Sequence, residues 1–151
     1  MEFLGLIIME NRLKPETYDV IAHLKEANIR TIMCTGDNIL TALSVAHDCE
    51  IIDSGDHVIR IEAKSGQEIS FFYEESLKKS LLPQSKQIEA YNESNLRFAI
   101  DGTSFAVIKN ENEAFLKQLA MRGVVFARMS PDQKQQLIET LQEVGYFVGM
   151  W

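Results

Sequence analysis

A Thr-Gly-Asp tripeptide, Thr35 to Asp37, stands between a strand-like apolar run and a helical pattern. The start of such a helix offers free N–H groups and the positive end of the helix dipole, and both attract a phosphate. Gly36 adds a backbone without a Cβ, and Thr35 can donate a hydrogen bond. The simpler alternative is that Gly36 only makes the turn, while Asp37 or Asn38 caps the helix. We call residues 35–37 the Thr-Gly-Asp loop.

Two basic residues, Arg128 and Lys134, flank the start of another helical pattern. Arg128 ends a strand-like run, and Lys134 lies one turn into the helix, so both can face the same crevice. The planar fork of Arg suits phosphate oxygens or a nucleotide, and the compact charge of Lys suits a phosphoryl group. The alternative is that both are solvated surface charges.

Other polar residues give weaker indications. Arg12 follows the first apolar run and can reach a ligand, although an Arg in such a turn usually pairs with a surface carboxylate. Asp101 can be a ligand or can initiate a turn, and we favour the turn. The three histidines lack the spacing of metal ligands, so we expect no metal site.

Five apolar runs have the composition of strands buried on both faces. They cover residues 3–9, 30–35, 98–101, 124–129 and 146–150. Helical spacing of apolar residues predicts helices between them. These helices cover residues 15–27, 38–48, 112–122 and 131–144. The last one opens with a Ser-x-x-Gln capping box, Ser130 to Gln133, and has Pro131 at its first position.

Strands that alternate with helices predict a doubly wound α/β fold with a mostly parallel sheet. In such a sheet ligands bind at the carboxyl ends of the strands, where the Thr-Gly-Asp loop, Arg128 and Lys134 are expected. Residues 54–96 depart from the pattern. They predict a hairpin that turns at residues 64–66, followed by a polar stretch, and we interpret them as a partly mobile insertion at the edge of the sheet.

Composition narrows the class of protein. The 151 residues, 46% of them hydrophobic, are enough for one domain with a core of its own. A formal charge of -7, without a cluster of Lys and Arg, argues against a nucleic-acid partner. The two cysteines, Cys34 and Cys49, are too few for a disulfide framework. No apolar run approaches the ~20 residues of a membrane span, so we expect a soluble segment without direct membrane insertion.

Several stretches, taken in order, resemble a known family. MENRLKPET, IRTIMCTGDNILTALSVA, FAIDGTSFAVI, VVFARMSPDQKQQLIETLQ and YFVGM follow one another as in the phosphorylation domain of P-type transport ATPases. The residues of these stretches are most similar to those of the type-five, subgroup B branch, the polyamine- and cation-transporting ATPases of late endosomes and lysosomes. The resemblance covers nearly the whole chain and is weakest over residues 54–96.

The resemblance implies a haloacid-dehalogenase-like Rossmann fold and a set of site residues. The Thr-Gly-Asp loop (Thr35, Gly36 and Asp37) would hold the phosphoryl group and the bound nucleotide. Arg128 would contact the nucleotide phosphates, and Lys134 would neutralise the phosphorylated aspartate. Arg12 would help to hold the nucleotide, less securely because Glu10 and Asn11 precede it. The implied cofactors are ATP and, in the intact protein, Mg²⁺.

The chain also departs from the family. The nucleophile motif Asp-Lys-Thr-Gly-Thr does not occur in it, and it ends where the family places the Mg²⁺-binding Gly-Asp-Gly-x-Asn-Asp. We therefore expect residues 1–151 to be part of a phosphorylation domain, inactive alone, whose partners are the nucleotide-binding, actuator and membrane domains at the cytosolic face of an endosomal or lysosomal membrane. The alternatives are a nucleotide- or partner-binding module without turnover, or a soluble phosphatase of the same superfamily.

Overall fold

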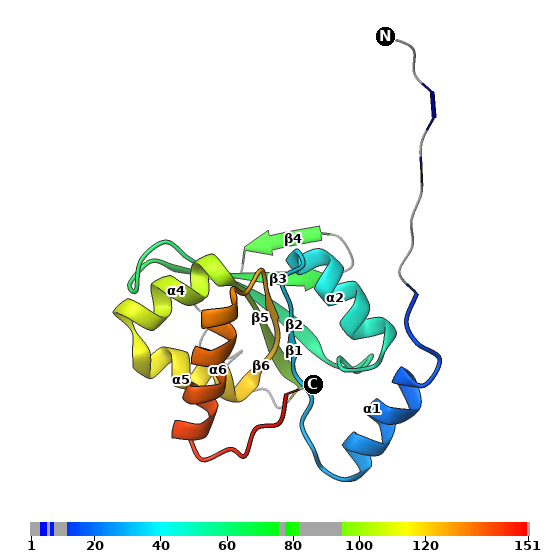
Figure 1. Cartoon of the computed structure of the whole chain (residues 1–151). Helices are drawn as coiled ribbons and strands as arrows, with labels where there is room; N and C mark the ends of the chain where they lie inside the picture. The colour runs from blue at the N-terminus through cyan, green and yellow to red at the C-terminus, as the bar shows by residue number, and fades with distance from the viewer. Residues whose placement is uncertain (1–3, 6, 8–11, 76–77, 82–94, 151) are drawn as a thin grey trace.

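The computed structural model shows a central sheet with helices on both faces (Figure 1). It describes residues 4–5, 7, 12–75, 78–81 and 95–150. The helices are α1 (Thr17–Glu26), α2 (Ile39–Asp48), α4 (Gly102–Glu111), α5 (Glu113–Arg122) and α6 (Pro131–Glu143). The strands are β1 (Met33–Cys34), β2 (His57–Ala63), β3 (Ile69–Glu75), β4 (Lys78–Leu81), β5 (Leu96–Asp101) and β6 (Gly123–Ala127).

The sheet has the strand order β1-β6-β5-β2-β3-β4. The first four strands in this order are parallel, whereas β3 and β4 are antiparallel to their neighbours. This arrangement confirms the predicted α/β fold with a mostly parallel sheet. The predicted hairpin also forms, since β2 and β3 pair on either side of residues 64–68. Its first strand pairs with β5 and therefore extends the parallel part of the sheet.

Alternate residues of the central strands point to opposite faces of the sheet, and this alternation divides the core in two. Val125 and Ala127 of β6 pack with α2, whereas Phe126 packs with the residues of α4, α5 and α6. On β5, Ala99 lies on the α2 side and Ile100 on the other. Small residues therefore face the single helix α2, and larger ones face the three-helix layer.

Local side-chain caps set where most of the helices begin. Asn38, Asp101, Asn112 and Ser130 each precede a helix and accept a hydrogen bond from the amide three residues later. Each bond satisfies one of the N–H groups that the first turn leaves without a partner. The capping box predicted at the start of α6 is present with both of its hydrogen bonds.

The helix α4 corrects the prediction that Asp101 initiates only a turn. The Asp101 carboxylate accepts a hydrogen bond from the Ser104 amide at 2.8 Å and so caps a helix of ten residues. Phe105 and Ile108 of this helix are fully buried. Burial of this apolar face outweighs the weak helix propensities of its first residues, Gly-Thr-Ser.

The predicted strand over residues 146–150 is wrong. These residues form no strand and run as an irregular segment after Gly145, which has a φ of 96°. A strand needs a neighbour that pairs with its backbone groups, and none of the described strands pairs with this segment. Of the strand predicted over residues 3–9, Leu4, Gly5 and Ile7 are not in a strand, and the others lie outside the described residues. Much of the polar stretch predicted to be mobile, residues 82–94, also lies outside them.

Candidate functional site

Three helices begin at one edge of the sheet, which we call the carboxyl edge. The parallel strands β1, β6 and β5 end there, and α2, α6 and α4 follow them directly along the chain. The positive ends of three helix dipoles thus meet along one side of the domain, and this arrangement favours an anion. In Figure 1, α2 lies on one face of the sheet, and α4, α5 and α6 lie on the other.

The Thr-Gly-Asp loop occupies the end of β1. The Thr35 amide donates to the Phe126 carbonyl on β6 at 2.9 Å, which anchors the loop to the sheet. The Thr35 hydroxyl donates to the Asp37 carboxylate at 2.8 Å and accepts from the Asp37 amide at 3.1 Å. Asn38, rather than Asp37, caps α2 by accepting from the Thr41 amide. Gly36 is exposed, and a Cβ at this position would meet no atom within 4 Å, so a ligand can approach its backbone.

A second loop, which begins at Arg128, is hydrogen-bonded to the first. The Arg128 amide donates to the Asp37 carbonyl, and the Met129 amide donates to the Thr35 carbonyl, each at 2.9 Å. Arg128 has a φ of 50°, a left-handed conformation that is uncommon for residues other than Gly. The Arg128 side chain is exposed. These contacts bring the backbone of Arg128 to the Thr-Gly-Asp loop, and the role of its side chain in binding phosphate stays a prediction.

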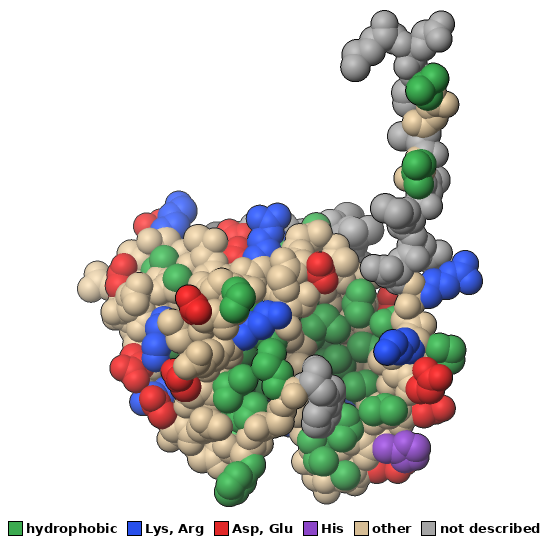
Figure 2. Space-filling model, viewed as in Figure 1, with side chains coloured by type: hydrophobic (Ala, Val, Ile, Leu, Met, Phe, Trp, Pro, Cys, Tyr) green, Lys and Arg blue, Asp and Glu red, His purple; other side chains and the backbone are tan. Residues whose placement is uncertain are grey.

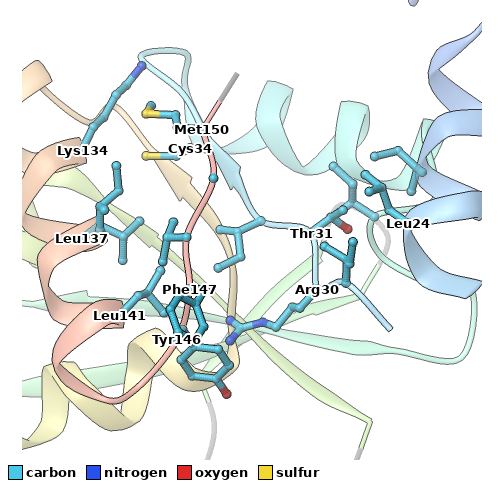
Figure 3. A pocket seen from close by; sticks show the side chains of 17 residues that line it. Leu24, Arg30, Thr31, Cys34, Lys134, Leu137, Leu141, Tyr146, Phe147 and Met150 are labelled. Atoms are coloured by element: carbon cyan, nitrogen blue, oxygen red, sulfur yellow. The ribbon is translucent and has the colours of Figure 1, made fainter. Parts of the chain in front are cut away.

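Lys134 lies in the first turns of α6 and is half-buried. Figure 3 shows its side chain reaching along the cleft between α6 and β1, with Cys34 on the facing strand. Burial raises the pKa of the Cys34 thiol, and the positive charge of Lys134 opposes that rise. Cys34 is the last residue of β1 and lines the same cleft as Lys134, so the Lys134 side chain lies beside the end of that strand. Lys134 and the Thr-Gly-Asp loop therefore approach the same corner of the carboxyl edge.

An apolar cleft of 310 Å³ lies beside β1, between α1 and α6. Figure 2 shows apolar side chains gathered on this face, on both sides of the place where the chain reaches its C-terminal residues. Arg30 crosses the cleft floor, stacks 5.9 Å from the Tyr146 ring and donates to the Ala120 carbonyl at 2.9 Å. Phe147 is fully exposed. The cleft is thus only partly filled by residues 146–150.

Two other predicted positions do not join this corner. Asp101 ends β5 at the same carboxyl edge, but its carboxylate is used as the cap of α4. Arg12 lies on the segment that leads into α1, and its contact with a nucleotide stays a prediction. In the part of the chain that the structure describes, no three His, Cys, Asp or Glu residues are grouped so that they could hold a metal ion.

Two contributions to the site were not predicted from the sequence. Gly102 packs against the Arg128 carbonyl, and Gln133 donates to the Gly102 carbonyl at 2.6 Å. The capping-box pattern marks Gln133 as a helix cap, but neither pattern nor composition indicates a contact across 31 positions of the chain.

Comparisons with known proteins agree with this fold. Residues 2–68 match the model of the haloacid dehalogenase-like hydrolases. Polyamine-transporting ATPase 13A3 of Macaca fascicularis is 46% identical over 99% of this chain, and that of Homo sapiens is 45% identical. Probable cation-transporting ATPase catp-6 of Caenorhabditis elegans is 36% identical, again over 99% of the chain.

The chain spans only 14% of the length of the 13A3 proteins and 15% of catp-6. Among the described residues, no helix is long and apolar enough to cross a membrane. The resemblance noted in the sequence is nevertheless confirmed, because the similarity runs through almost the entire chain. The chain is therefore homologous to one segment of the 13A P-type ATPases, and it contains a haloacid dehalogenase-like hydrolase region.

Proposed function

We propose that this chain is part of the phosphorylation domain of a P-type ATPase, and that its carboxyl edge binds the phosphate groups of ATP. In the intact protein this domain would lie at the cytosolic face of an endosomal or lysosomal membrane. It would couple ATP hydrolysis, through an aspartyl phosphate, to the transport of polyamines or cations. Relatives that are polyamine-transporting or probable cation-transporting ATPases support this class of transported substrate.

The observation that carries the proposal is the pair of hydrogen bonds between the two loops. Because Arg128 and Met129 donate to the Asp37 and Thr35 carbonyls, the Thr-Gly-Asp loop and the arginine share one rigid backbone unit. Lys134 approaches the same corner from α6. Phosphoryl transfer depends mainly on the positioning of phosphates and the neutralisation of their charge, and this unit is suited to both tasks.

Each residue has a distinct task in this proposal. Gly36 and the start of α2 offer backbone N–H groups to phosphate oxygens. The Thr35 hydroxyl, held by Asp37 in the free protein, would turn to the phosphate. Lys134 supplies a compact positive charge, and the exposed fork of Arg128 binds oxygens of the nucleotide phosphates. Arg12 would hold the nucleotide from the side.

Mg²⁺, which phosphoryl transfer by this family requires, does not fit the residues described here. One oxygen of the Asp37 carboxylate accepts from Thr35, and the Asp101 carboxylate caps α4. Mg²⁺ prefers several oxygen ligands in octahedral geometry. We therefore assign no step of the reaction to a metal ion held by this chain.

The remainder of the ATPase is the proposed partner of the chain. The apolar cleft beside β1 and the exposed Phe147 form a surface that a soluble protein seldom leaves uncovered. The edge of β1 that faces away from β6 has no strand beside it among the described elements. Both features are consistent with further chain packing there in the intact protein.

The phosphate site can be tested with the 151-residue chain and Mg²⁺-free ATP, followed by amide chemical shifts. We expect the largest shifts at Gly36, Asn38 and the first turn of α2. Lys134→Met and Arg128→Ala should each weaken binding by roughly tenfold or more, because each removes a charge-assisted contact. Lys109→Met is the matched control, since this lysine lies in the last turn of α4, at the other end of that helix.

Equal weakening by Lys109→Met would show that ATP binds only through nonspecific charge, and the proposal would fail.

A second measurement concerns turnover. The nucleophile motif is absent from the 151 residues, so labelled ATP should leave no hydroxylamine-sensitive phosphate on the purified chain. Such an adduct would contradict the assignment and favour a phosphatase-like enzyme.

A further inference from the structure

Gln133 makes two hydrogen bonds with opposite ends of its amide group. Its oxygen accepts from the Ser130 amide at 2.9 Å and completes the capping box of α6. Its nitrogen donates to the Gly102 carbonyl at 2.6 Å. A single side chain therefore joins the first turn of α6 to the first turn of α4.

The structure is tightly packed where this contact forms. A Cβ on Gly102 would lie 2.3 Å from the Arg128 carbonyl oxygen and 2.6 Å from the Gln133 side-chain oxygen. Real Cβ atoms do not approach backbone atoms so closely, and only a residue without a Cβ fits between the two loops. Gly102 is buried. The start of α4 is thus pressed directly against the loop that carries Arg128.

The second hydrogen bond is not needed for capping. A capping box works with Glu as well as with Gln, because only an acceptor has to reach the N-cap amide. The bond to the Gly102 carbonyl requires a donor, and a carboxylate has none. The choice of Gln at this position therefore matches a contact between helices rather than the cap alone.

We propose that Gln133 is a positioning residue, and that its bridge between α6 and α4 fixes how Lys134, the next residue, reaches the carboxyl edge. Without the bridge the first turn of α6 loses its side-chain hydrogen bond to α4. Loss of the bridge should let this turn shift and draw the ammonium group away from the end of β1. The importance of this placement for phosphate rests on the function proposed above, but the placement itself can be measured without a ligand.

Cys34 provides the measurement. Its thiol lies in the cleft with Lys134, and the positive charge of Lys134 lowers the thiol pKa against the effect of burial. The other charged or titratable groups that line the cleft are Arg30 and Tyr146, which contact each other. When Lys134 moves away, the pKa of Cys34 should rise, and its reaction with iodoacetamide should shift to higher pH.

The experiment compares Gln133→Met and Gln133→Glu with the wild-type chain. Both substitutions remove the donor to the Gly102 carbonyl, while Met leaves the net charge unchanged and Glu keeps an acceptor for the cap. Lys134→Met sets the full effect on Cys34. Ser130→Ala is the matched control, because it removes the other hydrogen bond of the capping box and leaves the bridge in place. Peptide mapping separates Cys34 from the buried Cys49.

We expect Gln133→Met to shift the Cys34 pH profile in the same direction as Lys134→Met, and Ser130→Ala to leave it unchanged. Amide hydrogen exchange in the first turn of α4 should rise roughly fivefold in both Gln133 variants, as for the loss of one ordinary hydrogen bond. A Cys34 profile that Lys134→Met moves but Gln133→Met does not would overturn the proposal. So would a profile that Ser130→Ala moves as far as Gln133→Met, since the effect would then come from the cap.

A titration with inorganic phosphate separates this proposal from the proposed function. If wild-type chain binds phosphate, Gln133→Met should weaken binding roughly fivefold. Unchanged phosphate affinity in that variant would show that the bridge has only a structural role, which would overturn the proposal. If the wild-type chain binds none, the phosphate site is refuted, and the Cys34 profile alone decides whether Gln133 positions Lys134.

Discussion

The carboxyl edge and the apolar cleft beside β1 are neighbours, but they are built by different means. At the carboxyl edge, short backbone and side-chain hydrogen bonds join the Thr-Gly-Asp loop, the Arg128 loop and Gln133. In the cleft, apolar side chains of α1, α6 and residues 146–150 line a space that they do not fill. The first region is held together by polar contacts within this chain, whereas the second leaves apolar surface exposed.

The difference between the two regions can be tested by truncating one large aromatic side chain in each of them. Phe126 is fully buried behind the Thr-Gly-Asp loop and packs edge-to-face with Phe105 at 6.4 Å. Phe126→Ala should lower the free energy of unfolding by about 3–5 kcal/mol, because it leaves a cavity in the core. Phe147→Ala should change it by less than about 0.5 kcal/mol, since Phe147 is fully exposed.

Urea denaturation followed by circular dichroism gives both values. A loss at Phe147 comparable to that at Phe126 would mean that residues 146–150 are part of the stable core. The two regions would then not differ as described.

The next largest effect concerns the backbone contact at the carboxyl edge. Gly102→Ala places a methyl group against the Arg128 carbonyl, and we expect a loss of about 1–3 kcal/mol from this overpacking. Gly55→Ala is the matched control, because a Cβ there meets nothing within 4 Å. Thermal melts of the two variants provide the measurement. If both melt together with the wild type, the loops at the edge are not in close contact.

The residues at this edge also show what the sequence can and cannot reveal. The Ser130 capping box and the Thr-Gly-Asp turn depend on neighbours within a few positions, so their residue types alone predicted the start of α6 and the loop after β1. The contact between Gln133 and Gly102 depends on how two distant helices pack. No local pattern encodes it, and the Asp-Gly pair was interpreted as a simple turn for that reason.

The missed helix α4 and the wrong strand over residues 146–150 have a common physical origin. Helix α4 opens with weak helix formers, and its stability comes from the burial of Phe105 and Ile108, which composition alone does not show. Residues 146–150 are apolar enough for a strand, but a strand exists only when a neighbour pairs with it. In both cases tertiary packing decided the outcome, and the hydrophobic pattern was ambiguous.

A smaller effect should be measurable at the cleft itself. Phe147→Ser removes an exposed aromatic ring from this face and should reduce the fluorescence of a bound hydrophobic dye such as ANS, without a change in the melting temperature. Leu40→Ser is the matched control, because Leu40 is also exposed but lies on α2. Equal loss of dye binding in both variants would indicate scattered surface contacts instead of one apolar site.

The smallest effect is expected along α6, the helix that joins the two regions. Lys117 of α5 contacts Glu143 in the last turn of α6 at 3.0 Å and Glu113 at 3.2 Å. The hydrogen bond that Lys117 donates to Glu143, together with the lysine charge, lowers the pKa of Glu143, and the same hydrogen bond, with smaller contributions, raises the pKa of Lys117. The stabilisation is therefore lost as pH falls through the folded pKa of Glu143 or rises through that of Lys117.

Lys117→Met should accordingly weaken the fold slightly at pH 7 and not at a pH well below about 4, where Glu143 is protonated in both states. Because all three side chains are at the surface, solvent screens the effect, and 1 M salt should remove most of it. Lys64→Met is the control, since Lys64 has one exposed partner at 3.4 Å and should show less change. A loss at Lys117 that is the same at both pH values would assign its contribution to packing of the lysine stem between α5 and α6. The last turn of α6 would then be held to α5 by apolar contact rather than by charge.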